Sequence, residues 1–225
     1  MDTISVVIPA LNAAATLPGT LAALRGGTGC EDGEVVVVDG GSGDGTAERA
    51  RAGGARVIAA PRGRGGQLAA GVAAARGDWL LLLHADTRLA PGWAEEAAWF
   101  MATHPDKAGY FRFALDSQAP EARGLERRVA WRCRWLALPY GDQGLLIRRA
   151  LLDAIGGIRP LPIMEDVALV RRLGRGRLVG LDATATTSAA RWERDGWRRR
   201  SAHNLCCLAL YFAGVPPRWI ARIYA

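Results

Sequence analysis

The chain has 225 residues, 50% of them hydrophobic, and a formal net charge of +7 with a pI of about 9.9. The length suits one α/β domain with a sizeable core and a C-terminal appendage, and the charge suits anionic partners, although it is carried almost entirely by arginine. The four cysteines form no CxxC pair, which argues against a zinc site or a disulfide framework and favours a reducing compartment.

Two buried strands with a helix between them open the chain. Residues 4–9 and 34–39 are apolar runs of strand length, and residues 12–25 carry a helical pattern with three leucines on one face. Strands that alternate with helices predict parallel β-α-β units whose faces are covered by helices. No basic region or cleavage site precedes the first strand, so we expect no signal peptide.

A glycine-rich loop, residues 39–46, follows the second strand. Its glycines let the backbone approach a ligand closely, and Thr46 can cap the helix expected over residues 47–51. Asp39 stands at the carboxyl end of a strand, where it can hydrogen-bond a nucleobase or ribose. An ordinary βα turn is the alternative. The loop does not match the dinucleotide pattern G-x-G-x-x-G, and no such loop follows the first strand.

A third, shorter strand is expected over residues 55–59, and a basic glycine-rich stretch follows it. Arg62 and Arg64 stand among glycines ahead of a helix expected over residues 68–76. Backbone amides and arginines at a helix N-terminus can hold an anion. Flexible basic loops are also common on protein surfaces, so this motif alone does not establish an anion-binding site.

The central strand of the predicted sheet is the apolar run 79–83, which ends abruptly in His84-Ala85-Asp86. This places Asp86 at the carboxyl edge, where open α/β sheets bind ligands. A carboxylate there can hold a hard divalent cation on a bound diphosphate. A plain strand-to-turn junction is the alternative, because Asp is common in turns.

The second half continues with a helix up to Thr103 that has Pro91 in its first turn, and a strand over residues 109–115. An Arg- and Trp-rich helix is expected over residues 121–138. Its apolar face contains three large side chains that we expect to pack rather than to function: Trp131, Trp135 and Leu138.

Two short polar motifs follow. Gly141-Asp142-Gln143 precedes a strand over residues 145–147, and Glu165-Asp166 precedes a helix over residues 167–173. Acidic residues that open a helix are stabilised by its dipole, so helix capping is the alternative for the second motif. A last inner strand over residues 177–181 and an extended edge over residues 183–188 complete the predicted sheet.

The C-terminal tail combines an Arg- and Trp-rich segment, residues 191–200, with the apolar run 205–215. This run is too short to span a bilayer. Arginine and tryptophan beside a short apolar helix suit an interfacial membrane helix. They equally suit a helix docked on its own domain or on a second subunit, and these alternatives stay open.

In their order and spacing, these segments resemble the family 2 glycosyltransferases, inverting enzymes of the GT-A fold, over essentially the whole chain. Residues 4–12 (ISVVIPALN) are similar to the family's opening strand and nucleotide-contacting turn, and residues 39–46 (DGGSGDGT) to its DDGSxDGT segment. Residues 84–86 (HAD) stand at the DxD position, and residues 164–166 (MED) at the ED motif. His84 departs from the usual first Asp of DxD, which leaves the metal preference open.

A narrower resemblance is carried by the sequences GDQG and MEDVAL and by the tail residues 188–192. These segments resemble a small bacterial subgroup that is associated by name with arsenosugar biosynthesis. Some of its members are labelled as carotenoid-acid glycosyltransferases. This resemblance implies the reaction class, sugar transfer. It implies neither an arsenosugar precursor nor a carotenoid acid as the acceptor.

The resemblance implies an α/β protein of the GT-A fold, with a Rossmann-like mixed central sheet flanked by helices and a C-terminal helical tail. The glycosyltransferase domain would cover residues 1–190. Within it, residues 1–88 would bind the nucleotide sugar and residues 89–190 the acceptor. The basic and apolar helical tail would cover residues 191–225.

The resemblance also implies roles for single residues. Asp166 is the expected general base, and Asp86 the expected ligand of Mg²⁺ or Mn²⁺. The expected nucleotide-sugar-binding residues are Pro9, Ala10, Asn12, Asp39, Gly41, Ser42, Arg62, Gln67, His84 and Ala85. The expected acceptor-side residues are Gly141, Asp142, Gln143, Glu165, Arg191 and Trp192.

The implied reaction transfers a hexosyl or related group from a nucleotide-diphosphate sugar, expected to be UDP-linked, to an acceptor hydroxyl. We expect a cytoplasmic protein, which would lie on the inner face of the membrane if the tail contacts lipid. We expect no nucleic-acid partner. A homodimer formed through the tail is an alternative to membrane contact. An NAD-dependent enzyme is disfavoured by the missing glycine fingerprint. A GT-A nucleotidyltransferase and a non-catalytic, membrane-associated nucleotide-binding module are the remaining alternatives.

Overall fold

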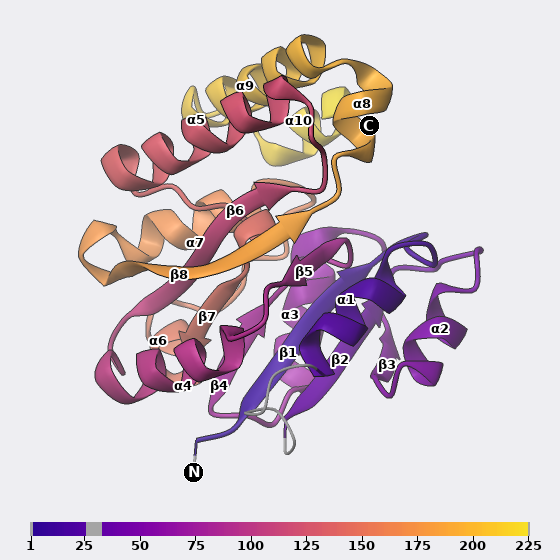
Figure 1. The fold of residues 1–225 in the computed structure, drawn as a ribbon, viewed down its shortest axis with the longest axis vertical. Helices are drawn as coiled ribbons and strands as arrows, with labels where there is room; N and C mark the ends of the chain where they lie inside the picture. The colour runs from indigo at the N-terminus through magenta and orange to yellow at the C-terminus, as the bar shows by residue number, and fades with distance from the viewer. Residues whose placement is uncertain (1, 26–32, 225) are drawn as a thin grey trace.

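The computed structural model describes residues 2–25 and 33–224, so Cys30 lies outside the described residues. One sheet runs through the molecule in the order β3-β2-β1-β4-β7-β6-β8-β5 (Figure 1). Its strands are β1 (Ile4–Ala10), β2 (Glu34–Asp39), β3 (Arg56–Ala59), β4 (Trp79–Leu82), β5 (Thr87–Leu89), β6 (Ala108–Leu115), β7 (Leu145–Arg148) and β8 (Leu178–Thr187).

Helices cover both faces of this sheet and form the C-terminal tail. The α-helices are α1 (Leu17–Arg25), α2 (Thr46–Ala52), α3 (Arg64–Ala74), α4 (Trp93–Thr103), α5 (Pro120–Leu136), α6 (Arg149–Ala154), α7 (Glu165–Leu173), α8 (Ala190–Asp195), α9 (Trp197–Phe212) and α10 (Pro217–Tyr224). Two short 3₁₀ helices complete the elements: η1 (Gly141–Gln143) and η2 (Arg175–Arg177).

The first half of the sheet is parallel. β1 pairs in parallel with β2 and β4, and β2 pairs in parallel with β3, so their carboxyl ends meet at one edge. α1 buries its leucines against one face and α3 packs on the other. α3 lies close to the sheet at Gly71, because a Cβ there would be 2.3 Å from Val7 Cγ1. The predicted β-α-β organisation is confirmed.

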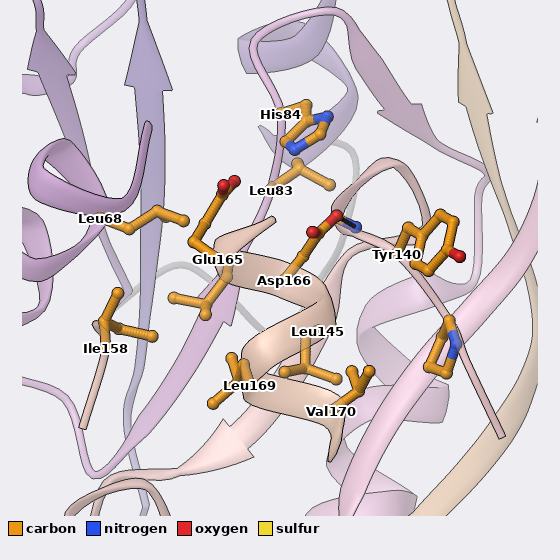
Figure 2. Close-up of a pocket in the computed structure, with 13 residues that line it drawn as sticks. Leu68, Leu83, His84, Tyr140, Leu145, Ile158, Glu165, Asp166, Leu169 and Val170 are labelled. Carbon is orange, nitrogen blue, oxygen red and sulfur yellow. Dashed lines mark hydrogen bonds between the residues drawn. The ribbon is translucent and has the colours of Figure 1, made fainter. Parts of the chain in front are cut away.

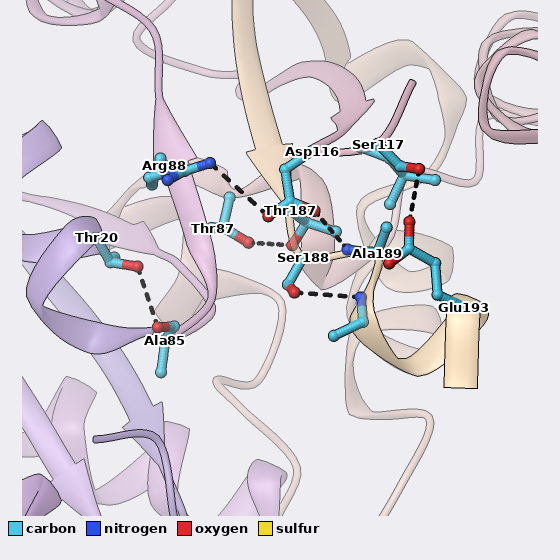
Figure 3. A network of polar contacts seen from close by, with 12 residues as sticks. Thr20, Ala85, Thr87, Arg88, Asp116, Ser117, Thr187, Ser188, Ala189 and Glu193 are labelled. Carbon is cyan, nitrogen blue, oxygen red and sulfur yellow. Dashed lines mark hydrogen bonds and ion pairs between the residues drawn. The ribbon is translucent and has the colours of Figure 1, made fainter. Parts of the chain in front are cut away.

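The second half adds antiparallel strands and fixes the segment that carries Asp86. β7 pairs antiparallel with β4, and β5 begins directly after Asp86 and pairs antiparallel with β8. The hydroxyls of Thr87 and Thr187 lie 2.6 Å apart in this pairing, and both side chains are buried (Figure 3). From the other side, Thr20 Oγ1 donates to the carbonyl oxygen of Ala85 at 3.0 Å. Asp86 therefore sits on a segment held by both halves of the sheet.

The C-terminal tail docks on its own domain. Cys207 of α9 and Ile220 of α10 are fully buried against Ile163, Met164 and Val167 at the start of α7. In Figure 1 the tail helices and α5 gather at the end of the molecule opposite the N-terminus. Across residues 2–25 and 33–224, no helix has both the length and the apolar character needed to cross a membrane.

Several helix starts differ from the prediction. α3 begins at Arg64, four residues earlier than expected, so this arginine belongs to the helix itself. Thr46 does not cap α2: Gly45 precedes the helix, and the Thr46 hydroxyl donates to Asp44. Pro91 lies before α4 and not in its first turn. β5 and α6 were not predicted.

The tryptophans of α5 contradict the packing expectation. Trp131 and Trp135 are 57% and 56% exposed, because α5 turns a different face to the sheet. Leu138 lies beyond the helix, which ends where Ala137 adopts a left-handed conformation (φ 52°). The buried face of α5 consists of Ala122, Val129 and Cys133.

Candidate active site

The loop after β2 folds back onto the end of β1. Both carboxylate oxygens of Asp39 accept the Ser42 N–H at 3.2 Å, and Ser42 Oγ accepts the Asn12 N–H at 2.9 Å. The Gly43 N–H donates in turn to Asn12 Oδ1 at 3.1 Å. Gly41 allows this turn through its positive φ of 89°. The loop is thus preorganised by hydrogen bonds before any ligand binds.

A groove of about 820 Å³ crosses the carboxyl edge from this loop to the C-terminal tail. This volume lies in the range of small-molecule sites, about 300–1,000 Å³. The predicted residues that line it are Pro9, Ala10, Asn12, Arg62, Gln67, His84, Ala85, Asp86 and Arg191. Three predicted donor residues, Asp39, Gly41 and Ser42, do not line the groove; the Ser42–Asn12 hydrogen bond connects them to its wall.

The Gln67 side chain connects the carboxyl ends of β1 and β2. Its Nε2 donates to the carbonyl oxygens of Ala10 and Val38, both at 2.8 Å, and its Oε1 accepts the Gly63 N–H at 3.3 Å. The residue is 4% exposed. Its amide is therefore used within the protein, and its contribution to donor binding stays a prediction.

His84 takes the place of the first DxD carboxylate. Burial, with the positive charges of Arg64 and Arg191, lowers its pKa well below the ordinary value, so the ring is neutral at pH 7. His84 packs so tightly on the η1 turn that a Cβ on Gly141 would lie 2.5 Å from its Nε2. A neutral imidazole in this position can hydrogen-bond a ligand without adding charge.

Asp166 enters the site from the first turn of α7. Its Oδ2 accepts the Gly141 N–H at 2.9 Å (Figure 2), and its Oδ1 accepts the Val167 N–H at 2.7 Å. The alternative of helix capping therefore holds in part, because the Asp166 carboxylate accepts a hydrogen bond from a backbone N–H in the first turn of α7. The same side chain lines a cavity together with His84 and Asp86.

Glu165, its neighbour, faces α3. Its side chain is 2% exposed, and Oε1 lies 3.4 Å from Arg64 Nε. Burial raises the pKa of Glu165 to about 7 against the lowering effect of Arg64. Burial alone would lower the pKa of Arg64, but the carboxylates of Glu165, Asp166 and Asp86 raise it. Arg64 stays charged and Glu165 connects the donor half to α7.

Asp142 on η1 lines a cavity of about 180 Å³ beside Asp166. Burial raises the pKa of Asp142 to about 6 against the lowering effect of Arg132, and the negative charges of Asp166 and Asp86 add to the rise. Trp192 lines the same cavity and stacks on Trp197, with ring centroids 6.0 Å apart. Three carboxylates therefore converge where a reacting group can sit.

Gln143, also predicted on the acceptor side, turns inward. Its Nε2 donates to the carbonyl oxygen of Phe111 at 3.1 Å, and its Oε1 accepts the Tyr140 N–H at 3.3 Å. The residue is 2% exposed and builds the η1 turn. In this turn Asp142 lines the 180 Å³ cavity, whereas Gly141 lines the neighbouring apolar pocket drawn in Figure 2.

The sequence analysis missed the tail residues of this cavity. Arg200, Asn204, Cys207 and Leu208 of α9 line it at spacings of four, seven and eight, which place them on one helix face. Tyr224 of α10 accepts a hydrogen bond from Arg200 at 2.8 Å and lines it as well. The spacing could have shown a helix face, but not the surface on which that face packs.

The site suits a cation that arrives with a diphosphate. Within the described residues, no group of three or more His, Cys, Asp or Glu side chains is arranged to hold a metal ion alone. Asp86 and Asp142 face one cavity with carboxylate oxygens, the ligands that Mg²⁺ and Mn²⁺ prefer. Mg²⁺ commonly binds one or two protein carboxylates and completes its shell with phosphate oxygens and water. The donor set fits that arrangement.

A mixed sheet with a ligand groove at the carboxyl ends of β1, β2 and β4, with helices on both faces and a C-terminal helical tail, defines a GT-A-like fold. Residues 5–161 match the family model described as glycosyl transferase family 2, so the chain belongs to that family. The predicted fold class and family are confirmed. No curated protein sequence matches the chain.

Solved structures with the same fold include complexes with UDP and with UDP-glucose. TarS residues 1–349 from S. aureus, in complex with UDP, has a TM-score of 0.64 and 20% identity over 83% of this chain and 61% of that chain. Glucosyl-3-phosphoglycerate synthase from Mycobacterium tuberculosis, in complex with Mn²⁺ and UDP-glucose, has a TM-score of 0.58 and 24% identity over 83% and 70%. This chain therefore spans about three fifths of the TarS fragment.

Proposed function

We propose that the protein is an inverting glycosyltransferase that moves a sugar from a UDP-linked donor to an acceptor hydroxyl, with Asp166 as general base and a divalent cation at Asp86. One observation carries the proposal: Asp166, Asp86 and His84 line a single cavity that the tail covers, and His84 and Asp86 also line the donor groove. The structural neighbours in complex with UDP or with UDP-glucose and Mn²⁺ support the donor and the metal.

In this mechanism, the donor lies across the carboxyl ends of β1, β2 and β4. Asn12, which lines the groove and is connected to Asp39 through Ser42, holds the nucleoside. Arg62 and Arg191, which also line the groove, offset the diphosphate charge. A cation bound at Asp86 would supply Lewis-acid stabilisation of the leaving diphosphate. His84, neutral and tightly packed, orients the donor without repelling the cation.

The transfer is a single displacement. The acceptor oxygen forms a bond to the anomeric carbon while the bond to the diphosphate oxygen breaks, and UDP leaves with the electron pair. Asp166 takes the hydroxyl proton. Its two hydrogen bonds to backbone N–H groups fix the carboxylate, and each oxygen keeps a further lone pair for the acceptor. Attack from the face opposite the leaving group inverts the anomeric configuration.

The test separates donor binding from chemistry. We expect calorimetry to show UDP binding that depends on Mn²⁺ or Mg²⁺ and weakens about tenfold, or about 1.4 kcal/mol, in Asp86→Ala and Asp39→Ala. Asp166→Asn should bind UDP like the wild type but lose transfer roughly 100- to 10,000-fold. Asp153→Asn, an exposed site on α6, is the matched control. UDP affinity that ignores metal and both alanine variants would overturn the donor site.

Two alternatives have separate signatures. A GT-A nucleotidyltransferase would release diphosphate while joining a sugar phosphate to a nucleoside triphosphate, and product analysis distinguishes it. A non-catalytic nucleotide-binding module would be insensitive to Asp166→Asn in every assay. The three carboxylates that line the tail-covered cavity, Asp86, Asp142 and Asp166, favour the transferase over both.

The remaining proposals concern location. We propose a cytoplasmic enzyme that binds the inner membrane surface through exposed apolar side chains beside arginines on α5, α9 and α10: Trp131, Trp135, Leu205, Phe212, Trp219 and Ile223. The arsenosugar-associated subgroup, the absence of a nucleic-acid partner and the homodimer stay predictions.

A further inference from the structure

Buried side-chain oxygens without a hydrogen-bond partner concentrate around the cavity beside Asp166, whereas the unpaired nitrogens of Trp93 and His203 lie outside its lining. Most buried side-chain polar atoms in proteins have a hydrogen-bond partner, and each exception calls for an explanation. Within residues 2–25 and 33–224, the buried side-chain oxygens without a hydrogen-bond partner belong to Tyr140, Asp142, Glu165 and Asn204. Glu165 has Arg64 as its ion-pair partner. The other three residues all line the 180 Å³ cavity.

These three atoms come from two separate elements of the chain. Tyr140 Oη and Asp142 Oδ1 belong to the η1 turn, and Asn204 Oδ1 belongs to α9 of the tail. Asn204 shares its face of α9 with Arg200, Cys207 and Leu208, and no hydrogen bond within the protein uses its amide oxygen. Leaving such an oxygen unpaired destabilises the protein, and a ligand that donates a hydrogen bond to it offsets that cost.

The chemistry of the three atoms selects the ligand. A carboxamide oxygen and a carboxylate oxygen accept hydrogen bonds, and a phenol hydroxyl both accepts and donates. The ligand must therefore present several donors, as a compound with multiple hydroxyl groups does. The apolar wall formed by Ile163, Met164 and Val167 suits the carbon face of such a compound.

The charges around the cavity disfavour an anionic ligand. Asp86, Asp142 and Asp166 all face it. Arg64 is paired with Glu165, and Arg200 is held by Asp195 at 3.4 Å and by Tyr224 at 2.8 Å. Arg191, the third arginine that lines the cavity, also lines the donor groove, where the proposed mechanism assigns it to the diphosphate. A ligand phosphate or carboxylate would thus meet three carboxylates, two arginines that already have partners and one that the donor uses.

We propose that this cavity is the acceptor site and binds a neutral compound with several hydroxyl groups, held by Tyr140, Asp142 and Asn204 with one hydroxyl toward Asp166. Asn204 is then a specificity-determining residue supplied by the tail. The proposal rests on the transferase function above and goes beyond it by assigning the acceptor class and the role of α9.

The experiment measures UDP release from UDP-glucose and other UDP-sugars with Mn²⁺, using the full chain. Glycerol, glucose and methyl glucoside are the neutral probes, and glycerol phosphate and 3-phosphoglycerate are the anionic ones. We expect neutral probes to stimulate UDP release, and Asn204→Leu to raise the KM for the stimulating probe at least tenfold. Cys206→Ser, exposed on the same helix, should leave that KM unchanged.

Two further measurements separate recognition from folding. Asn204→Leu replaces an unpaired buried oxygen by an apolar group, so we expect an equal or higher Tm and unchanged calorimetric affinity for UDP. A Tm that falls together with activity would mean a structural role and overturn the proposal. Stimulation by anionic probes alone, or by no probe while UDP still binds, would overturn it too. If the wild type does not bind UDP at all, that result would instead contradict the proposed glycosyltransferase function.

Discussion

The adjacent carboxylates Glu165 and Asp166 occupy different environments and have different tasks. The Glu165 side chain is 2% exposed and reaches Arg64 on α3, so it joins the two halves of the molecule. Asp166 accepts two backbone hydrogen bonds and lines the cavity, so its carboxylate is fixed at the cavity wall. Burial therefore sets the charge state of Glu165, and hydrogen bonds set the orientation of Asp166.

The raised pKa of Glu165 predicts a pH-dependent stability. The pKa rises from 4.5 to about 7 on folding, because burial disfavours the charged form. Between these values the native state binds more protons than the unfolded state, so the contribution of Glu165 to the free energy of unfolding falls as pH rises. We expect the wild type to lose stability relative to Glu165→Gln from pH 4.5 to 7, by at most about 1.4 kcal/mol per pH unit.

The measurement is urea unfolding of both proteins at several pH values. The difference between them is the useful quantity, because Asp142, with a pKa of about 6, contributes in the same direction and His84, with its lowered pKa, in the opposite one. Glu121→Gln, exposed on α5, is the control. A difference between wild type and Glu165→Gln that stays constant with pH would contradict the prediction.

At the scale of elements, prediction succeeded where the pattern is local. Apolar runs and a 3.6-residue period located β1, β2, β4 and α1, because burial on both faces leaves a continuous signal. It failed for β5, a three-residue strand that exists through its pairing with β8, about a hundred residues later. The same limit applies to the site: the family resemblance predicts roles for Asp86 and Asp166. Neither the Arg64–Glu165 ion pair nor the position of Asn204 in the same cavity as Asp142 follows from local sequence.

The contact of α3 with the sheet gives a stability prediction. A Cβ at Gly71 would lie 2.3 Å from Val7 Cγ1 and 2.8 Å from Val38 Cγ2, and both valines are fully buried in strands. Overpacking of roughly 1–3 kcal/mol should exceed the helix-propensity gain of about 0.5–1 kcal/mol from Gly→Ala. We expect Gly71→Ala to lower the Tm. Gly66→Ala, on the same helix with no atom within 4 Å, is the control, and equal Tm values for the two would refute the prediction.

At the scale of the whole molecule, the site forms where three parts meet. The parallel strands supply the donor edge, η1 and α7 supply Asp142 and Asp166, and the tail closes the second cavity with Asn204 and Tyr224. The tail is therefore part of the site and also part of the surface (Figure 1). The proposed acceptor site and the proposed membrane contact therefore share α9 and α10: Asn204 and Tyr224 line the cavity, and Leu205, Phe212, Trp219 and Ile223 are exposed.

That surface has the composition of an interfacial membrane site. Trp131, Trp135 and Trp219 are 57%, 56% and 48% exposed. Arginines flank them: the Arg134 guanidinium lies 5.6 Å from the Trp135 ring, and that of Arg222 lies 4.6 Å from the Trp219 ring. Tryptophan favours the lipid headgroup region, and arginine favours anionic lipids by about 1 kcal/mol per residue near the surface.

We therefore expect the protein to sediment with vesicles of phosphatidylglycerol and phosphatidylcholine, and much less with phosphatidylcholine alone. Replacing Trp131, Trp135 and Trp219 by serine should weaken binding at least tenfold while UDP affinity stays unchanged. Trp99→Ser is the matched control, because Trp99 is 56% exposed but lies on α4, away from α5 and the tail (Figure 1). Weaker binding in the control, or full binding by the triple variant, would place the membrane contact elsewhere. Retained binding at 0.5 M salt would mean that apolar insertion, and not arginine charge, holds the protein there.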